Sequence, residues 1–211
     1  MKLAAGATIL FQGDSITDCE RSRNQESPNA GLGTGYAARL AGDLLADRPT
    51  DGFRMFNRGI SGNRIVDLYA RWRIDAILLR PDLISILIGV NDTWHGFTSD
   101  NGVEVERFEQ VYRLLLDYTR ECLPASRFVL MEPFVLPVGV VEPAWEREMA
   151  ERQAVVHGLA GDYSAVFVPL QKPFEKAAEE GGPAYWLHDG VHPTPAGHAL
   201  IAREWRRATG L

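Results

Sequence analysis

The stretch DLISILIGV, residues 82–90, is the longest nearly continuous apolar run in the chain. A parallel strand with helices on both of its faces is apolar almost throughout, whereas a strand with one solvated face alternates apolar and polar residues. We therefore predict a central parallel strand over Asp82–Val90. Asn91 and Asp92 follow it directly, at the carboxyl end of the strand, where open α/β sheets bind their ligands.

Four further strand patterns alternate with helical patterns along the chain. The expected strands are Ala7–Phe11, Phe53–Asn57, Phe128–Met131 and Ala165–Val168, and the expected helices are Tyr36–Leu45, Arg64–Leu79, Val103–Cys122, Pro143–Gly161, Lys172–Glu180 and a last helix from Thr194 or Pro195 to Ala208. Parallel neighbours need crossover connections, usually helices, so this alternation predicts a parallel sheet covered on both faces. The expected fold class is α/β with three layers, α/β/α.

The composition fits a single domain over residues 1–211, because the chain shows no internal repeat or low-complexity linker. The net charge of -6 argues against nucleic acid or an anionic membrane as the main partner. Apolar runs fall short of the ~20 residues needed to cross a bilayer. Met1 and Lys2 precede a short apolar run that resembles a signal peptide, but cleavage there would remove the first strand. We expect a soluble, cytoplasmic protein.

The two cysteines, Cys19 and Cys122, show no CxxC spacing. A disulfide framework or a zinc site is therefore not expected, and a reducing compartment is compatible with the chain. Asp92 and the neighbouring Asn91 could offer oxygen ligands to a metal ion, but the sequence shows no third and fourth ligand for such a site. We therefore interpret Asp92 as a structural residue.

Residues 33–38, GTGYAA, formally match the G-x-G-x-x-A fingerprint of dinucleotide-binding proteins. The context differs, because these glycines follow the polar, charged loop Asp18–Asn29 and not a strand. The next strand ends in Asn57 and Arg58, without the acidic residue that binds a ribose. A nucleotide-binding protein is the less favoured alternative, and retention of no nucleotide on purification would exclude it.

Residues that can take part in catalysis follow the first, second, third and fifth predicted strands. In chain order they are Ser15, the glycines Gly59 and Gly62, Asn91, and the Asp189-x-x-His192 segment. Acyl transfer by a serine needs a base, a carboxylate that orients the base, and donors for the developing oxyanion. All of these groups occur at the predicted rim of the sheet.

Four sequence blocks together resemble the SGNH hydrolases, also called the GDSL esterases and lipases. The blocks are Gly13-Asp14-Ser15, Asn57-Arg58-Gly59-Ile60-Ser61-Gly62, Gly89-Val90-Asn91-Asp92 and Asp189-Gly190-Val191-His192-Pro193. The resemblance covers the whole chain and implies a flavodoxin-like sheet of five parallel strands in the order 2-1-3-4-5. The G-x-S-x-G elbow of the α/β-hydrolases is missing from the sequence, so that larger superfamily is not the match.

Carried over residue by residue, the resemblance implies that Ser15 is the nucleophile and His192 the general base, oriented by Asp189. His188 is an alternative base next to Asp189. Adjacent side chains rarely face each other, so His192 is preferred.

The same resemblance implies an oxyanion hole built from the Ser15 N–H, the Gly62 N–H and the side-chain amide of Asn91. Gly59 lies in the same loop as Gly62, and composition alone does not choose between them. The family pattern favours Gly62.

Longer stretches resemble the intracellular acetylxylan esterases of this family, which deacetylate short xylo-oligosaccharides. They are residues 13–19, GDSITDC; residues 32–36, LGTGY; residues 59–63, GISGN; residues 88–92 with Trp94; and residues 191–193 running into Ala196-Gly197-His198. The resemblance implies no metal or organic cofactor and a homo-oligomer. A thioesterase or lysophospholipase for longer acyl chains is the alternative hydrolase, and a catalytically silent carbohydrate-binding protein is the alternative from another class.

Three residues are candidates for substrate binding. Trp94 lies just beyond the proposed oxyanion amide, where it would either stack on a sugar ring or pack the loop. Trp186 precedes the Asp189 block. Asp14, next to the nucleophile, is expected to contact substrate or, more simply, to brace the turn.

Overall fold

The computed structural model describes residues 1–24 and 27–211; residues 25 and 26, in the predicted loop Asp18–Asn29, lie outside the described part. The sheet is formed by β1 Thr8–Gly13, β2 Arg54–Asn57, β3 Leu83–Leu87, β4 Arg127–Met131 and β5 Val166–Val168. All neighbouring strands are parallel, in the order β2-β1-β3-β4-β5. The α/β class and the strand order are therefore confirmed.

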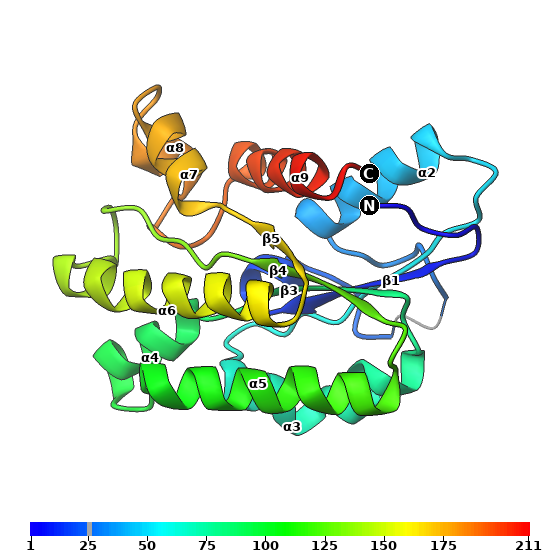
Figure 1. Cartoon of the computed structure of the whole chain (residues 1–211). Coiled ribbons are helices and arrows are strands. Elements are labelled where there is room, and N and C mark those ends of the chain that lie inside the picture. Colours follow the sequence, from blue (N-terminus) through cyan, green and yellow to red (C-terminus); the bar gives the residue numbers. More distant parts are fainter. Residues whose placement is uncertain (25–26) are drawn as a thin grey trace.

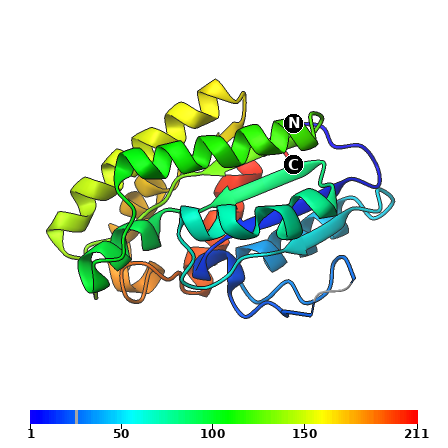
Figure 2. The same cartoon turned by 90° about the horizontal axis from the view of Figure 1, so that it is seen from below.

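Helices cover both faces of this sheet. They are α1 Ser15–Asp18, α2 Tyr36–Asp47, α3 Ile65–Asp75, the 3₁₀ turn η1 Ile77–Leu79, α4 Val90–Ser99, α5 Val105–Cys122, α6 Pro143–Asp162, α7 Gln171–Ala178, α8 Pro183–Trp186 and α9 Pro195–Thr209. Figure 1 shows α2 and α9 over one face and α3 and α5 over the other. Seen from below in Figure 2, α3 and α5 run along the sheet. Each face has its own apolar core.

Pairing between β1 and β3 brings the loop after β1 close to the loop after β3. All five residues of β3 are buried, as expected for a strand between two helical layers. Gly13 at the end of β1 pairs with Leu87 at the end of β3. A Cβ atom at Gly13 would lie only 2.2 Å from the Leu87 carbonyl oxygen, so a residue with a side chain cannot occupy this position. The loop with Ser15 therefore begins directly beside the loop with Asn91.

The predicted ends of the third strand and of the helix before it differ most from the structure. The predicted third strand, Asp82–Val90, stops at Leu87, because Gly89 has a φ of 132° and Val90 begins α4. Val90 is buried, so it continues the apolar pattern although it is helical. The predicted helix Arg64–Leu79 breaks at Ala76 and finishes as η1.

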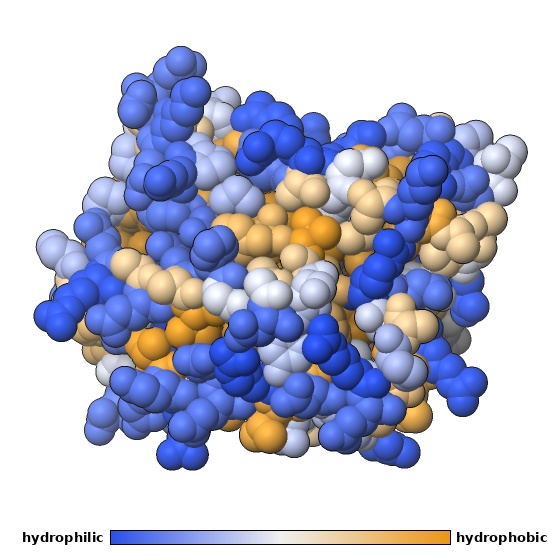
Figure 3. Space-filling model, in the orientation of Figure 1, coloured by the Kyte–Doolittle hydropathy of each residue, from blue (hydrophilic) through white to orange (hydrophobic). Residues whose placement is uncertain are grey.

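Strand β5 lies at one edge of the sheet, opposite β2, and its first two residues, Val166 and Phe167, are only half-buried. In Figure 3, hydrophilic residues border the visible face and hydrophobic residues gather toward its middle, around the position of β5 in Figure 1. Among the described helices, none has the length and apolar character that a membrane span requires.

Candidate active site

Ser15 is the first residue of α1 and follows β1 after a sharp turn. Asp14 caps this helix by accepting a hydrogen bond of 3.0 Å from the Ile16 N–H. The Asp14 side chain is buried, and burial raises its pKa to about 7. The structure therefore places Asp14 as a brace of the turn, out of reach of a substrate.

The three predicted triad residues form one chain of hydrogen bonds. The Ser15 Oγ atom lies 2.9 Å from His192 Nε2, and His192 Nδ1 lies 2.7 Å from Asp189 Oδ2. Although burial acts to raise the pKa of Asp189, the N–H groups of His192 and Val191 and the His192 ring hold it below its usual value. An ionised Asp189 fixes the proton on Nδ1, which leaves Nε2 as the acceptor for the Ser15 hydroxyl.

The segment Leu187–Pro193 is a closed loop that holds Asp189 and His192 together. Leu187 and Pro193 form an antiparallel bridge, and the His188 N–H donates to the His192 carbonyl at 3.2 Å. Asp189 Oδ1 accepts the His192 N–H at 2.7 Å. The carboxylate therefore orients both the backbone and the ring of His192, the predicted general base.

The loop between β4 and α6 packs against this triad loop. Gly190 has a φ of 90°, and a Cβ atom there would approach the Val138 carbonyl oxygen to 2.3 Å. The Leu136 N–H donates to the Gly190 carbonyl at 2.9 Å, and the Val140 N–H donates to the Asp189 carbonyl at 3.0 Å. A side chain at position 190 would therefore displace the loop that carries the triad.

The predicted oxyanion groups meet Ser15 at a hollow of about 430 Å³. Its described lining residues are Ser15, Ser61, Gly62, Asn91, Trp94, His95, Thr98, Ser99 and His192. Gly62 has a φ of 82° and open space at its Cβ position, whereas a Cβ atom at Gly59 would lie 2.4 Å from the Asp18 nitrogen. Gly62 therefore faces the hollow, and Gly59 serves close backbone packing.

Two buried carboxylates fix the loop that contains Gly62. Asp18 Oδ2 accepts the Ser61 N–H at 2.9 Å and its hydroxyl at 3.0 Å. Asp92 Oδ1 accepts the Ile65 N–H at 3.0 Å. Asp92 is fully buried, and burial raises its pKa to about 7. The loop is thus held on both sides of the glycine.

Helix α4 forms a second wall of the hollow, and this helix was not predicted from the sequence. Its pocket residues Asn91, His95 and Thr98 are spaced as on one face of a helix. This spacing was overlooked because the apolar run before it was assigned to a strand up to Val90. The half-buried Trp94 ring lies 5.6 Å from the His192 ring and 5.5 Å from the Trp145 ring, centroid to centroid. Trp94 therefore packs against His192 and also lines the hollow.

Trp186 is not one of the described residues that line the hollow beside Ser15. Its indole N–H donates to the carbonyl of Ala177 at 2.8 Å and to that of Glu180 at 3.1 Å. The ring lines a different hollow, of about 560 Å³, together with residues of α7 and α9. The predicted contact between Trp186 and substrate has no support in this arrangement.

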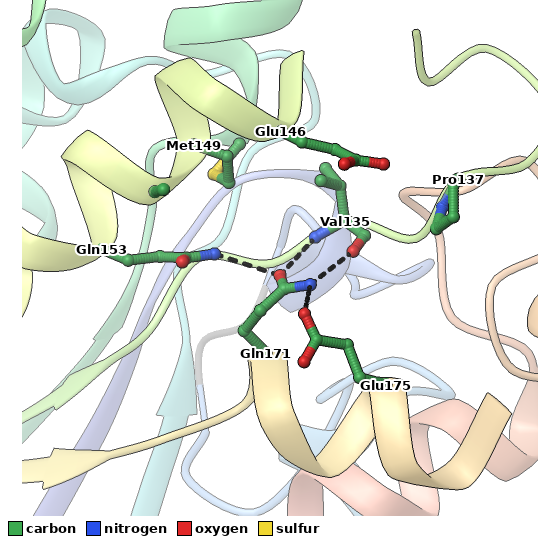
Figure 4. Close-up of a pocket in the computed structure, with 8 residues that line it drawn as sticks. Val135, Pro137, Glu146, Met149, Gln153, Gln171 and Glu175 are labelled. Carbon is green, nitrogen blue, oxygen red and sulfur yellow. Dashed lines mark hydrogen bonds between the residues drawn. The ribbon is translucent and has the colours of Figure 1, made fainter. Parts of the chain in front are cut away.

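A further hollow of about 380 Å³ lies between α6, α7 and the loop after β4. Figure 4 shows that the side chain of Gln171 fills one wall, where it bonds to both backbone polar groups of Val135 and to Gln153 and Glu175. Its lining residues, as far as the structure describes them, include no serine, cysteine or histidine.

The side chains of His188, Asp189 and His192 offer ligand atoms that lie within 4.8 Å of one another. The His188 ring stacks beside the His192 ring, with 5.8 Å between centroids. Within the described chain, this is the group of residues that could hold a metal ion.

Comparison with known proteins identifies the family of this chain. Residues 11–200 match the model of the GDSL-like lipase/acylhydrolase family. The chain is 38% identical to an acetylxylan esterase of Geobacillus stearothermophilus, over 100% of this chain and 97% of that protein. A crystal structure of that esterase superposes with a TM-score of 0.91, at 38% identity and with the same coverage.

The structure of a candidate GDSL-like lipase from Parabacteroides merdae superposes with a TM-score of 0.96, at 41% identity, over 99% of this chain and 98% of that chain. The family match extends over nine-tenths of the sequence and includes all the elements that carry the site. The chain belongs to the GDSL-like lipase/acylhydrolase family and is a carboxylic ester hydrolase.

Proposed function

We propose that this protein is a serine esterase that removes acetyl groups from short carbohydrates, with acetylated xylo-oligosaccharides as its substrates. The observation that carries the proposal is the chain of hydrogen bonds from Ser15 through His192 to Asp189, at 2.9 and 2.7 Å. Gly62 and Asn91 line the same hollow as Ser15.

In the first half-reaction, the Ser15 oxygen attacks the carbonyl carbon of the acetyl group, and its proton passes to His192 Nε2. The carbonyl oxygen becomes an oxyanion, which accepts hydrogen bonds from the N–H groups of Ser15 and Gly62 and from the Asn91 amide. The ester C–O bond then breaks, and His192 returns the proton to the departing sugar oxygen. The products are the free sugar hydroxyl and an acetylated Ser15.

In the second half-reaction, His192 takes a proton from water, which attacks the acetyl carbonyl of the acyl-enzyme. The same donors hold the second oxyanion. Its collapse breaks the bond to the Ser15 oxygen, which recovers its proton from His192 as acetic acid leaves and then ionises in water. Asp189 remains ionised throughout and stabilises the charged imidazole.

The lining of the hollow favours a small acyl group and a substrate rich in hydroxyls. Among the described lining residues, only Trp94 has a large hydrophobic side chain, and lipid acyl chains need extended apolar walls. One relative of this chain is an acetylxylan esterase. Its solved structures include catalytic mutants in which a serine, an aspartate or a histidine is replaced by alanine.

The test is release of acetate from acetylated xylo-oligosaccharides, compared with hydrolysis of p-nitrophenyl acetate, butyrate and octanoate. The proposal expects rapid acetate release and a rate that falls as the acyl chain lengthens. A preference for octanoate would move the function to thioesters or lysophospholipids. Binding of the oligosaccharide without any release of acetate would indicate a carbohydrate-binding protein.

Two further properties stay predictions from the sequence. A homo-oligomer would elute from a calibrated sizing column well ahead of a 23.4 kDa chain. A cytoplasmic location predicts recovery with the soluble contents of the cells that produce the protein.

A further inference from the structure

A cluster of metal-binding side chains overlaps the catalytic triad. Asp189 Oδ2 lies 2.7 Å from His192 Nδ1 and 3.8 Å from His188 Nε2. Two imidazole nitrogens and a carboxylate oxygen are a ligand set typical of zinc sites that keep one position open for water. A catalytic serine esterase needs His192 and Asp189, but it has no requirement for His188.

We propose that His188, Asp189 and His192 bind a zinc ion, and that this ion reversibly switches the esterase off. The inference rests on the proposed function for its consequence, loss of activity, but not for the binding itself. The ion would be held by His188 Nε2, Asp189 Oδ2 and His192 Nδ1, with water as the fourth ligand.

The cluster can form this site by a rearrangement of its own side chains, whose ligand atoms already lie within 4.8 Å of one another. Bonds of about 2.0–2.1 Å in tetrahedral geometry place ligand atoms about 3.3 Å apart, and the two separations from Asp189 Oδ2 lie on either side of this value, at 2.7 and 3.8 Å. The rings of His188 and His192 are inclined by only 21°, so one of them must rotate to direct its nitrogen at the ion. The side chain of His188 is 61% exposed, which leaves it free to do so.

Zinc at this position blocks catalysis through the tautomer of His192. In the working triad the imidazole carries its proton on Nδ1 and accepts the Ser15 proton at Nε2. A zinc ion on Nδ1 occupies the lone pair there, so the single proton of the neutral ring moves to Nε2. No proton is lost or gained by the ring, yet Nε2 is converted from an acceptor into a donor. Ser15 then has no base.

The same ion also removes the partner that stabilises a charged imidazole. Asp189 Oδ2 accepts the His192 ring proton in the resting triad, and in the zinc-bound state that oxygen is a metal ligand. Inhibition should therefore appear as a loss of kcat, because the hollow formed by Gly62, Asn91 and α4 is not occupied by the ion.

The test measures zinc binding and zinc inhibition separately on the intact chain. Zinc chloride is titrated into wild type, His188→Gln and the control His157→Gln, in which an exposed histidine on α6 that packs against Phe167 is replaced. Binding is followed by competition with a chromophoric zinc chelator. Inhibition is reported as the ratio of the rates with zinc and with EDTA, so that each variant is its own reference.

The expected result is one zinc ion per wild-type chain, inhibition that EDTA reverses, and unchanged behaviour in His157→Gln. His188→Gln should weaken both binding and inhibition by at least about 10–100-fold, since losses of that size follow when only an outer-shell partner of a metal ligand is removed. Equal zinc affinity in wild type and His188→Gln would overturn the proposal, and so would a wild type that binds no zinc. If the EDTA-treated enzyme has no esterase activity, the proposed function fails, while the binding titration still decides the site.

Discussion

The side-chain amide of Asn91 donates a hydrogen bond of 3.1 Å to the carbonyl oxygen of Asn63. An asparagine amide has two N–H groups, so this bond leaves the second one for a substrate oxyanion. Asn63 directly follows Gly62 in the loop that lines the hollow. Asn91 therefore fixes the loop that contains Gly62, and its second N–H is available for the proposed role as an oxyanion donor.

Asn91→Ala should lower kcat for p-nitrophenyl acetate by about 10²–10³-fold, with a smaller change in KM, because an oxyanion donor acts mainly in the transition state. The control is Asn101→Ala, in an exposed loop where Arg64 also bonds to the backbone carbonyl of residue 101. It should stay near the wild-type rate. A loss confined to KM in Asn91→Ala would remove this residue from the oxyanion hole.

Asp92→Ala should destabilise the protein by about 1–3 kcal/mol, because it leaves the buried N–H of Ile65 without its acceptor. Asp92→Asn keeps an oxygen at that position and should recover most of the loss. Urea denaturation at pH 7 gives the free energy of unfolding of both variants. Equal stability of the two variants would show that the contact to Ile65 does not matter.

Asp189→Asn should lower kcat by about 10⁴-fold, because an amide can donate to His192 Nδ1 and leave the proton on Nε2, the wrong tautomer. Asparagine retains an oxygen for the N–H groups of Val191 and His192, so the thermal unfolding temperature should change little. Asp162→Asn removes an exposed partner of Arg113 and serves as the control. Substantial activity in Asp189→Asn would contradict the assigned triad.

His198 predicts a pH-dependent contribution to stability. Its ring is buried on α9, where Nδ1 accepts the Tyr36 N–H at 3.2 Å and Nε2 lies 3.4 Å from the Cys19 sulfur. Burial lowers the pKa of His198 to about 4. Between pH 6.5 and 4, the unfolded chain therefore binds a proton here that the native protein does not, and stability falls as the pH falls.

His198→Asn keeps an acceptor for the Tyr36 N–H and has no group that titrates. The free energy of unfolding of wild type minus that of the variant should decrease by about 1.4 kcal/mol per pH unit across this window. Urea denaturation of both proteins at pH 7, 5.5 and 4 measures the difference. A difference that does not change with pH would contradict the lowered pKa.

The strands and the order of the chemical groups were predictable because they depend on local patterns. The apolar run at 82–90 and the turn after Gly13 contain signals that do not need the rest of the chain. The start of α4 could not be located in this way, since Val90 is buried in a helix as it would be in a strand. Apolar character reports burial and not the type of element.

The substrate-binding candidates show the limit of arguments from proximity in sequence. Asp14 and Trp186 precede predicted catalytic residues in the chain, yet one caps α1 and the other bonds to carbonyls near the end of α7. Trp94 reaches the hollow because α4 turns its ring toward His192. Side-chain direction depends on the element and its packing, which the sequence fixes only through the tertiary structure.

The most direct test of the account compares wild type with Ser15→Ala on p-nitrophenyl acetate, with Ser126→Ala, just before β4 at the opposite end of the sheet, as the control. We predict a loss of at least about 10³-fold in kcat for Ser15→Ala and none for the control. Wild type quenched during turnover should carry one acetyl group on the peptide that contains Ser15. Equal rates in wild type and Ser15→Ala, or an acetyl group on another residue, would contradict the assignment of Ser15 as the nucleophile.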